Sequence, residues 1–277
     1  FVPWVLKDYS SNTIDLNDAN IYRDLTKAIG TINEHRLKEL LENKNNFKNH
    51  SIDPYLFSSG PVCPLTLFLW LIRLEPFTSL HIKVQEGKFD HPNRIFYSIY
   101  DSFRLASSHR NDFRELIPEF YYCPEFLINF DKFDLGKLNN QFPINDIELP
   151  NWANNSPYEF VYTLRKAMES DYVSLNLNNW IDLIWGIKQK DDLNRYKSEM
   201  YADVWLNNPN IDPAKKSGIE ETLRQVCQIP PQLFTEIHPI RNSKASQKIS
   251  TLKNSFKIDF GELDSILAVN VTLCSSI

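Results

Sequence analysis

Glycine is scarce in this sequence. The chain has 7 glycines in 277 residues, and the two that lie closest together along it are Gly60 and Gly87. Loops that hold phosphate groups need closely spaced glycines, because only then can several backbone amides approach the ligand. The common nucleotide-binding loops and the GxSxG turn of esterases are therefore excluded. No cofactor is expected.

Cysteines and long apolar runs are scarce as well. The 4 cysteines are scattered, and no two have the spacing of metal ligands or of a redox pair. The most apolar uncharged stretch, 60–72, includes two prolines and is shorter than the roughly 20 apolar residues that a membrane-spanning helix needs. With 42% hydrophobic and 13% aromatic residues, the chain can form a large core without disulfides. We expect a soluble cytoplasmic protein.

An excess of basic residues is also missing. The chain has 30 Lys and Arg against 35 Asp and Glu, a net charge of −5, which argues against a broad nucleic-acid-binding face. One stretch departs from this balance, since Lys244, Lys248, Lys253 and Lys257 have no acidic residue among them. The favoured interpretation is a solvated linker, and the alternative is a contact with anionic lipid.

Residue patterns typical of catalysis are weak. The densest group of potential metal ligands is His81, Glu86, Asp90 and His91, but it matches no metal-binding motif, and Asp90-His91-Pro92 fits the start of a helix better. We therefore predict no metal site. A hydrolase triad assembled from distant residues cannot be recognised in a single sequence, so a hydrolase stays the alternative from another functional class.

Three glutamates flank an aromatic stretch and suggest paired catalytic carboxylates. They are Glu115, Glu119 and Glu125, and glycoside hydrolysis uses two such groups about 5 to 10 Å apart. The favoured interpretation is structural. Glu119 and Glu125 adjoin Pro118 and Pro124 in what we expect to be buried extended chain, where a carboxylate accepts backbone amides.

Helix signals are frequent along the chain, whereas strand signals are weak. Thr31 and Glu34 have capping-box spacing, and Ser156, Pro157 and Glu159 occupy the preferred cap and first-turn positions. Four of the expected helices are defined by their starts, which lie near Thr31, at Asp90, at Ser156 and at Ser217. Two more are expected over 61–74, with burial on every side, and from Asn178 to Gly186.

Two aromatic- and proline-rich segments, 120–133 and 142–152, lack the alternation of strands and are too apolar for open loops. We predict that they are extended, irregular and buried, with backbone groups satisfied largely by polar side chains. The resulting fold class is mainly α, with irregular extended core segments surrounded by helices and little regular sheet.

Charged residues interrupt several apolar stretches of the sequence. Arg73 and Glu75 lie within 71–77, and Asp182 lies within 180–185. Lys83, Asp90 and Arg94 lie in the same way among the apolar residues of 80–96. Because burying an unpaired charge is costly, we predict that these charged residues form internal ion pairs that join irregular segments.

The composition changes after Arg241. Residues 242–257 are rich in Ser, Lys and Asn and predict a linker, and 258–277 regain apolar character with the β-prone run 266–271. We expect 258–277 to begin a following β domain. The chain starts with Phe1 rather than Met, which we interpret as the start of a fragment.

Several ordered sequence blocks resemble the signature blocks of BEACH domains, over 1–241. The blocks are RLEPFT at 73–78, KFDHPNR at 88–94, ELIPEF at 115–120, NDIELPNW at 145–152, WIDLIWG at 180–186 with Lys188-Gln189, and QLF at 232–234 before His238-Pro239. The chain departs from the family at 53–56, where relatives carry Gly and His, at Asn178 in place of a usual His, and along 191–210. The resemblance also leads us to expect the family's first segment before Phe1.

The resemblance implies an unusual fold with an irregular extended core and no enzymatic activity. It implies a preceding PH-like domain that packs on the BEACH domain, and WD40 repeats that begin within 258–277. Proteins of this family are large scaffolds in vesicle trafficking, lysosome-related organelles, autophagy and receptor sorting, peripherally associated with endomembranes. Other trafficking proteins are the expected partners.

We assign two groups of residues on this basis. Glu119 and Asp182 form the expected structural polar core. The candidate wall of a groove for the PH-like domain or another partner comprises Arg73, Glu75, Phe77, Lys83, Asp90, His91 and Arg94.

Overall fold

The computed structural model describes residues 1–50, 53–61, 64–109, 111–139, 141–201, 209–226 and 229–241. All of them lie in one compact unit, Phe1–Arg241. The predicted linker 242–257, its four lysines and the predicted β segment 258–277 lie outside the described residues and stay predictions.

Helices and short 3-10 turns make up most of the regular structure in these residues. The α-helices are α1 Glu34–Asn49, α2 Pro64–Trp70, α3 Phe77–Val84, α4 Ile99–Ser108, α5 Pro157–Met168, α6 Asp171–Ile184 and α8 Pro213–Val226. The 3-10 turns are η1 Ala19–Ile21, η2 Ile29–Thr31, η3 Pro92–Arg94, η4 Pro118–Tyr121, η5 Pro124–Leu127, η6 Asn151–Ala153 and η7 Ser198–Met200.

Regular sheet is confined, within the described residues, to one antiparallel hairpin. Strand β1 Lys137–Leu138 pairs with β2 Phe142–Pro143, with Lys137 opposite Pro143. The predicted mainly α fold with little regular sheet is confirmed.

The helix starts show where sequence signals succeed. The Ser156 hydroxyl accepts a hydrogen bond from the Glu159 amide at 3.2 Å, so α5 begins as predicted. Helix α1 also forms, but its cap is Asn33, whose side-chain oxygen accepts from the Arg36 amide at 3.0 Å. Thr31 lies in η2 and donates its hydroxyl to the Ala28 carbonyl, so the predicted Thr31 cap is wrong.

Other helix boundaries differ from the prediction. Helix α2 ends at Trp70 and has several half-buried positions, so it is shorter and more exposed than expected. Asp90 starts no long helix, because the chain forms η3 and then a separate helix α4 capped by Ser98. Helices α6 and α8 begin earlier, at Asp171 and Pro213.

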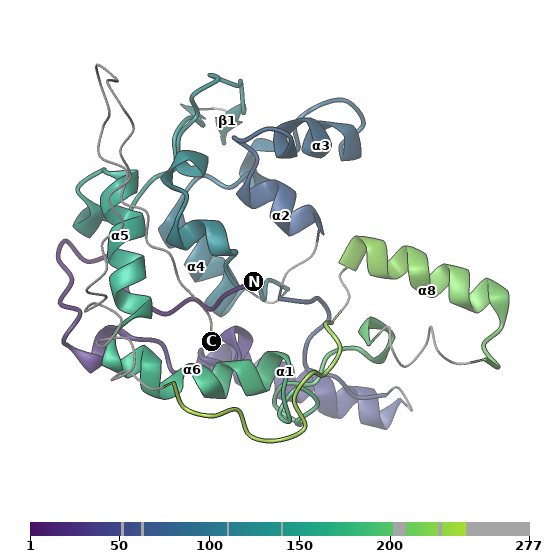
Figure 1. The fold of residues 1–277 in the computed structure, drawn as a ribbon. Helices are drawn as coiled ribbons and strands as arrows, with labels where there is room; N and C mark the ends of the chain where they lie inside the picture. Colours follow the sequence, from purple (N-terminus) through teal and green to yellow (C-terminus); the bar gives the residue numbers. More distant parts are fainter. Residues whose placement is uncertain are drawn as a thin grey trace, which may run out of the picture. The chain divides into compact units, whose positions relative to one another are not determined.

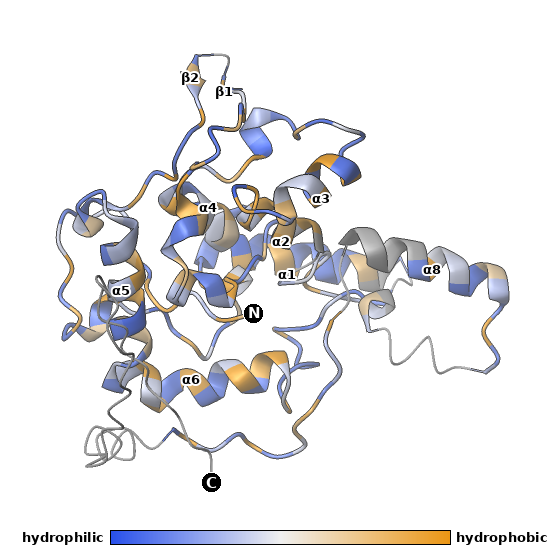
Figure 2. Ribbon diagram, turned by 45° about the horizontal axis from the view of Figure 1, so that its top comes forward, coloured by the Kyte–Doolittle hydropathy of each residue, from blue (hydrophilic) through white to orange (hydrophobic). Residues whose placement is uncertain are grey.

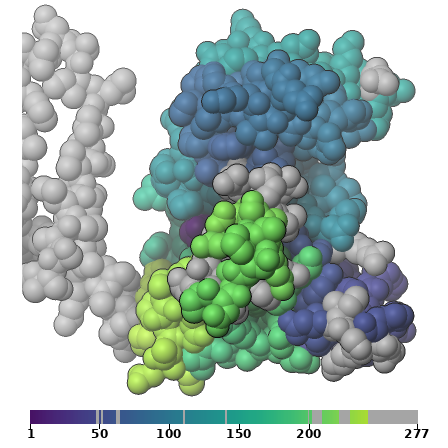
Figure 3. Space-filling model, turned by 90° about the vertical axis from the view of Figure 1, so that its right-hand side faces the viewer, coloured from purple at the N-terminus to yellow at the C-terminus, as the bar shows by residue number. Residues whose placement is uncertain are grey.

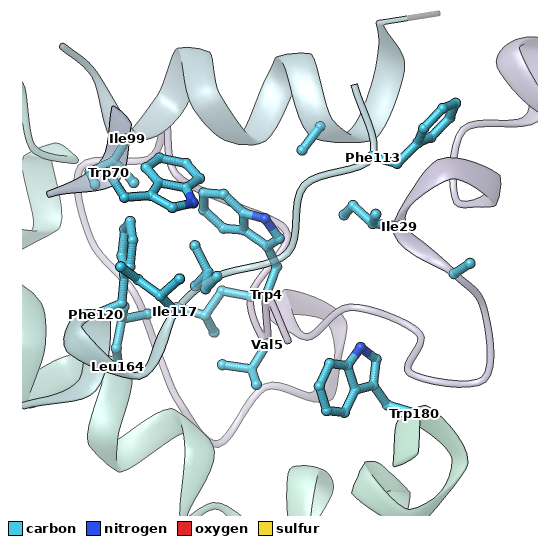
Figure 4. Close-up of a cluster of buried hydrophobic side chains, with 14 of the residues drawn as sticks. Trp4, Val5, Ile29, Trp70, Ile99, Phe113, Ile117, Phe120, Leu164 and Trp180 are labelled. Atoms are coloured by element: carbon cyan, nitrogen blue, oxygen red, sulfur yellow. The ribbon is translucent and has the colours of Figure 1, made fainter. Parts of the chain in front are cut away.

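The N-terminal segment lies in the centre of the core. Figure 1 shows it (purple) between α4 and α6, and an isolated antiparallel bridge pairs Val2 with Leu116. Trp4 and Val5 are completely buried, and Figure 4 shows them among side chains from α4, α6 and the 113–120 segment. The Trp4 ring contacts the Trp70 ring at a centroid distance of 6.3 Å.

The irregular segments contribute much of the core, as predicted. Phe120, Phe126 and Leu127, on η4 and η5, are completely buried. Figure 2 shows apolar residues (orange) on connecting segments as well as on helices. The burial is not complete, because Phe130 and Phe142 are 60% and 66% exposed.

Helix α8 occupies a peripheral position. It contacts α2 and η7, and Figure 3 shows it (green) on the surface of this unit. Asp212 precedes the helix, and its carboxylate accepts from the Ala214 amide at 2.8 Å.

Candidate interaction site

A buried ion pair holds the central segments together. The Arg23 guanidinium and the Glu115 carboxylate, each 1% exposed as residues, make two hydrogen bonds of 2.8 and 2.9 Å. Glu115 also accepts from the Trp4 amide at 3.1 Å and from the Trp180 indole at 3.0 Å. One carboxylate therefore joins the N-terminal segment, the 113–117 segment and α6.

The sequence-based reasoning missed this pair. Arg23 lies outside the apolar stretches with embedded charges. A structural role was favoured over a catalytic one for the three glutamates that include Glu115, but no partner was predicted for Glu115. Both oxygens of Glu115 are bound to donors within the core, and Glu125 is exposed. The arrangement is that of a structural ion pair, in which multiple hydrogen bonds offset the cost of burying two charges.

Arg73 fixes two further irregular segments. The residue is 1% exposed, and its guanidinium donates to the Asn145 carbonyl at 2.8 Å and to the Phe96 carbonyl at 2.9 Å. Burial lowers the pKa of Arg73 to about 10, an effect opposed by the nearby Asp146 carboxylate. The prediction of burial is confirmed, but the hydrogen-bond partners are backbone carbonyls instead of an acid.

Arg36 performs a similar role on another side of the core. It donates to the Ala106 carbonyl at 2.7 Å and to the Asp112 carbonyl at 2.5 Å. Its guanidinium also lies 4.4 Å from the centre of the Phe113 ring. Helix α1 thereby binds the backbone at Ala106 in α4 and at Asp112.

Asp182 binds the last described segment of the chain. It is completely buried, and its Oδ1 accepts from the His238 amide at 3.1 Å. The predicted ion pair is not formed by Asp182 within the described residues. Glu119 is half-buried, and its Oε1 accepts from the Tyr122 hydroxyl at 3.3 Å.

Four of the seven predicted groove residues are exposed, among them Glu75 and Lys83. The expected internal ion pairs are therefore not formed at these two residues. The Glu75 carboxylate instead accepts from the amide and hydroxyl of Ser79 in the first turn of α3. The sequence shows that these residues adjoin apolar ones but cannot show which face of α3 is solvent-exposed. Phe77, the first residue of α3, is half-buried.

The segment after α3 contains the remaining predicted residues. The Asp90 amide donates to Nε2 of buried His81 at 3.2 Å, and the Asp90 carboxylate forms an ion pair with Arg94. His91 is exposed, and its Nδ1 accepts from the Asn93 amide at 3.3 Å as the cap of η3. Burial lowers the pKa of His81, and the Asp90 carboxylate opposes that shift.

A groove of about 540 Å³ lies beside α2 and α4. We call it the α2–α4 groove. Its lining residues come from α2, α4, residues 59–60, residues 93–97, His109 and residues 111–114. Of the seven predicted groove residues, Arg94 is among its lining residues and the other six are not.

The α2–α4 groove combines apolar and charged lining. Leu69 and Leu105 contribute apolar side chains from the two helices. Arg114 makes a bidentate ion pair with Asp112 at 2.6 to 3.0 Å and lies 5.0 Å from the centre of the Trp70 ring. These contacts fix the charged groups before any partner arrives, which suits a protein-binding surface.

Tyr97 and Asp101 add a second polar contact to this groove. The Tyr97 hydroxyl donates to the Asp101 carboxylate, which also pairs with Arg104. Burial, and then this hydrogen bond, raises the pKa of Tyr97 to about 12. The phenol therefore stays protonated at neutral pH and keeps its hydrogen bond to the Asp101 carboxylate in the groove.

Comparison with known proteins places these features in context. A family model described as Beige/BEACH domain matches residues 1–241. BEACH domain-containing protein B of Arabidopsis thaliana is 38% identical over 244 residues, which cover 86% of this chain and 9% of that protein. BEACH domain-containing protein lvsE of Dictyostelium discoideum is 38% identical over 258 residues, covering 90% of this chain and 12% of that protein.

A putative neurobeachin homolog of Caenorhabditis elegans is 39% identical over 246 residues, covering 87% of this chain and 10% of that protein. The chain therefore spans about a tenth of the length of these relatives. Among the described residues, none of the helices is both long and apolar enough to cross a membrane.

Proposed function

This chain belongs to the BEACH domain family, and from that premise we propose that it is a non-catalytic protein-interaction module of a larger trafficking scaffold. The names of its relatives include a putative neurobeachin homolog and the lvs proteins, which fit a scaffold role in membrane traffic. Vesicle trafficking, lysosome-related organelles and autophagy are the proposed settings, with peripheral attachment to endomembranes from the cytoplasm.

The α2–α4 groove is the observation that carries this proposal. Its apolar lining and its charged groups are held by contacts within the chain itself. These include the Arg114–Asp112 pair and the Arg36 hydrogen bonds to the Ala106 and Asp112 carbonyls. A preorganised surface loses little conformational entropy on binding, so more of the contact energy appears as affinity.

We propose a PH-like domain, encoded before this segment in the same protein, as the partner in this groove. WD40 repeats after the segment and other trafficking proteins are the further proposed partners. Arg94 lines the groove, while Asp90 and His91 adjoin it in sequence and order the loop that presents Arg94.

The test compares the melting temperature of this chain with that of the chain extended to include its preceding domain. Binding stabilises the folded state by roughly 4 kcal/mol when the effective concentration is about 1,000 times Kd, so we expect a clearly higher melting temperature for the extended protein. Equal melting temperatures would overturn the proposed packing.

A groove variant locates the contact. Leu105→Arg places a charge in the α2–α4 groove, and Leu175→Arg is the matched control because Leu175 is 55% exposed on α6, outside the groove. The first substitution should remove the stabilisation by the preceding domain, and the second should leave it intact. If both variants keep the full stabilisation, the PH-like domain binds elsewhere.

A further inference from the structure

A second hollow lies on a different part of the surface, between the N-terminal loop and helices α4 and α6. It has a volume of about 580 Å³, within the range of ligand-binding pockets. We call it the Lys7–Lys27 pocket, because these two lysines line it together with residues of 19–33, α4 and α6. It shares no lining residue with the α2–α4 groove.

The apolar part of the Lys7–Lys27 pocket is formed by side chains that pack on other rings of the chain. The Tyr22 and Tyr172 rings, which both line it, stack on each other with centroids 4.8 Å apart. Phe103 of α4 also lines it and packs against the buried Trp4 ring at 5.3 Å. Ile32 adds an aliphatic surface. An apolar side chain would find fixed packing partners here.

The charged part of this pocket is positive. Lys7, Arg23 and Lys27 line it together with one acid, Asp24. Because Glu115 neutralises the buried Arg23, the two exposed lysines supply the positive charge that a ligand can reach. Lys27 lies 3.7 Å from the Asp24 carboxylate in an exposed pair, and Lys7 has no ion-pair partner among the described residues. This local excess stands out in a chain with a net charge of −5. A negatively charged group entering the pocket therefore meets the Lys7 ammonium and a Lys27 ammonium that is held only by a weak, exposed ion pair.

Two acids of the same N-terminal loop, Asp15 and Asp18, are not among the lining residues of the pocket. Asp18 accepts hydrogen bonds from the Asn20 amide and side chain, and Asp15 does the same for Asn17. Both carboxylates are therefore bound within their own loop. Arg23 is paired with Glu115 below the pocket, yet its Nε has no acceptor among the described residues.

We propose that the Lys7–Lys27 pocket binds a short acidic segment of a partner protein. A carboxylate of that segment would lie between Lys7 and Lys27, and an adjacent apolar side chain would pack against Phe103 and Ile32. This combination of charge and apolar surface matches a peptide with acidic and apolar residues side by side. A membrane surface fits less well, since none of the largely exposed apolar side chains of the described residues lines this pocket.

The test is a selection from a random peptide library displayed on phage, with the whole chain as the target. The selected peptides should be rich in Asp and Glu next to Leu, Ile or Phe. One selected peptide is then synthesised with a fluorescent label, and its Kd is measured by anisotropy for the wild type and for Lys7→Glu/Lys27→Glu. We expect the double variant to bind at least about tenfold more weakly, because two attractive charges become repulsive.

The matched control is Lys38→Glu/Lys137→Glu, which reverses two exposed lysines outside the pocket and should leave the Kd nearly unchanged. Thermal melting of both variants checks that they stay folded. Selected peptides without acidic enrichment, or equal Kd values for the two double variants, would overturn the proposal. Binding of phosphatidylserine vesicles lost only in Lys7→Glu/Lys27→Glu would reassign the pocket to anionic lipid and overturn it as well.

The outcome of the peptide-binding test is independent of the outcome of the melting-temperature test of the proposed function. The peptide test reverses charges at Lys7 and Lys27, whereas the packing of the preceding domain is tested at Leu105 in the α2–α4 groove. A chain that is stabilised by its preceding domain and selects no acidic peptide would keep the first proposal and lose the second.

Discussion

Glu115 is the residue on which most of the irregular core depends. It binds the Arg23 guanidinium, the Trp4 amide and the Trp180 indole at once. Each of these donors comes from a different part of the chain, and each would lose a buried acceptor without the carboxylate. An unmatched buried donor costs free energy whether or not it is charged.

Glu115→Gln should therefore destabilise the fold strongly. It leaves Arg23 as a buried charge without its counterion, and breaking such a pair typically costs about 3–5 kcal/mol of unfolding free energy. Urea unfolding followed by circular dichroism measures the loss. Glu125→Gln is the control, since Glu125 is exposed, and should have little effect. A loss for Glu115→Gln as small as that of the control would show that the pair is not structural.

Arg73→Lys tests whether the geometry of the guanidinium matters as well as its charge. A lysine keeps the charge, but its single ammonium group cannot bind the Asn145 and Phe96 carbonyls together as the planar guanidinium does. We expect a loss of about 1–3 kcal/mol, the usual cost of leaving a buried acceptor unsatisfied. Arg94→Lys, at an exposed arginine, should change stability by much less. Equal effects would contradict the role given to Arg73.

His81 should make stability depend on pH. Its pKa is lowered in the folded protein, mainly by burial, so folding favours the neutral ring that accepts from the Asp90 amide. The contribution of the neutral ring is complete above the unfolded pKa of about 6.5 and is lost as pH falls through the folded pKa.

Unfolding of the wild type and of His81→Gln, measured from about pH 7.5 to about pH 5, should show a larger drop for the wild type. Identical pH dependence in both proteins would contradict this account of His81. The same comparison with His91→Gln, at an exposed histidine, should show no such difference.

Charged residues within apolar stretches of the sequence were predicted to be buried, and this prediction is right for some of them and wrong for others. Arg73 and Asp182 are buried, as their apolar neighbours indicate, whereas Glu75 and Lys83 are exposed. Short apolar stretches do not reveal which face of a helix meets solvent. Arg23 has no such signal, because its burial depends on long-range contacts with 113–117.

At the scale of elements, local capping signals decide what the sequence reveals. The Ser156 cap of α5 was predictable because cap, proline and acid all occur at their preferred spacing. The start of α1 was misplaced by the competing Thr31 signal, and α3 was missed because it is short and directly follows a proline. The segments 120–133 and 142–152 carry no periodic signal, so their paths depend on contacts remote in sequence.

The cap of α1 offers a test at this scale. Asn33→Ala removes the side-chain oxygen that accepts from the Arg36 amide and should cost about 1 kcal/mol of unfolding free energy. Asn33→Asp supplies an equivalent acceptor and should be nearly neutral. Chemical denaturation of the two variants measures both values. An equal loss for both would show that Asn33 does not act through its cap.

At the scale of the whole molecule, helices surround segments that have no regular hydrogen-bond ladder of their own. Backbone groups of these segments bind one another across isolated bridges, such as Val2 with Leu116 and Ser98 with Glu148. Buried arginine and glutamate side chains bind many of the others. The α2–α4 groove and the Lys7–Lys27 pocket are both formed partly by segments held in this way.

Amide hydrogen exchange tests this arrangement most directly. The Leu116 amide donates to the Val2 carbonyl at 3.0 Å, and the Glu148 amide donates to the Tyr97 carbonyl at 2.8 Å. If buried side chains pin these irregular segments, both amides should exchange only through global unfolding, as slowly as the interior of α5. Exchange as fast as that of the Ser10 amide, in the exposed loop near the N-terminus, would contradict the account.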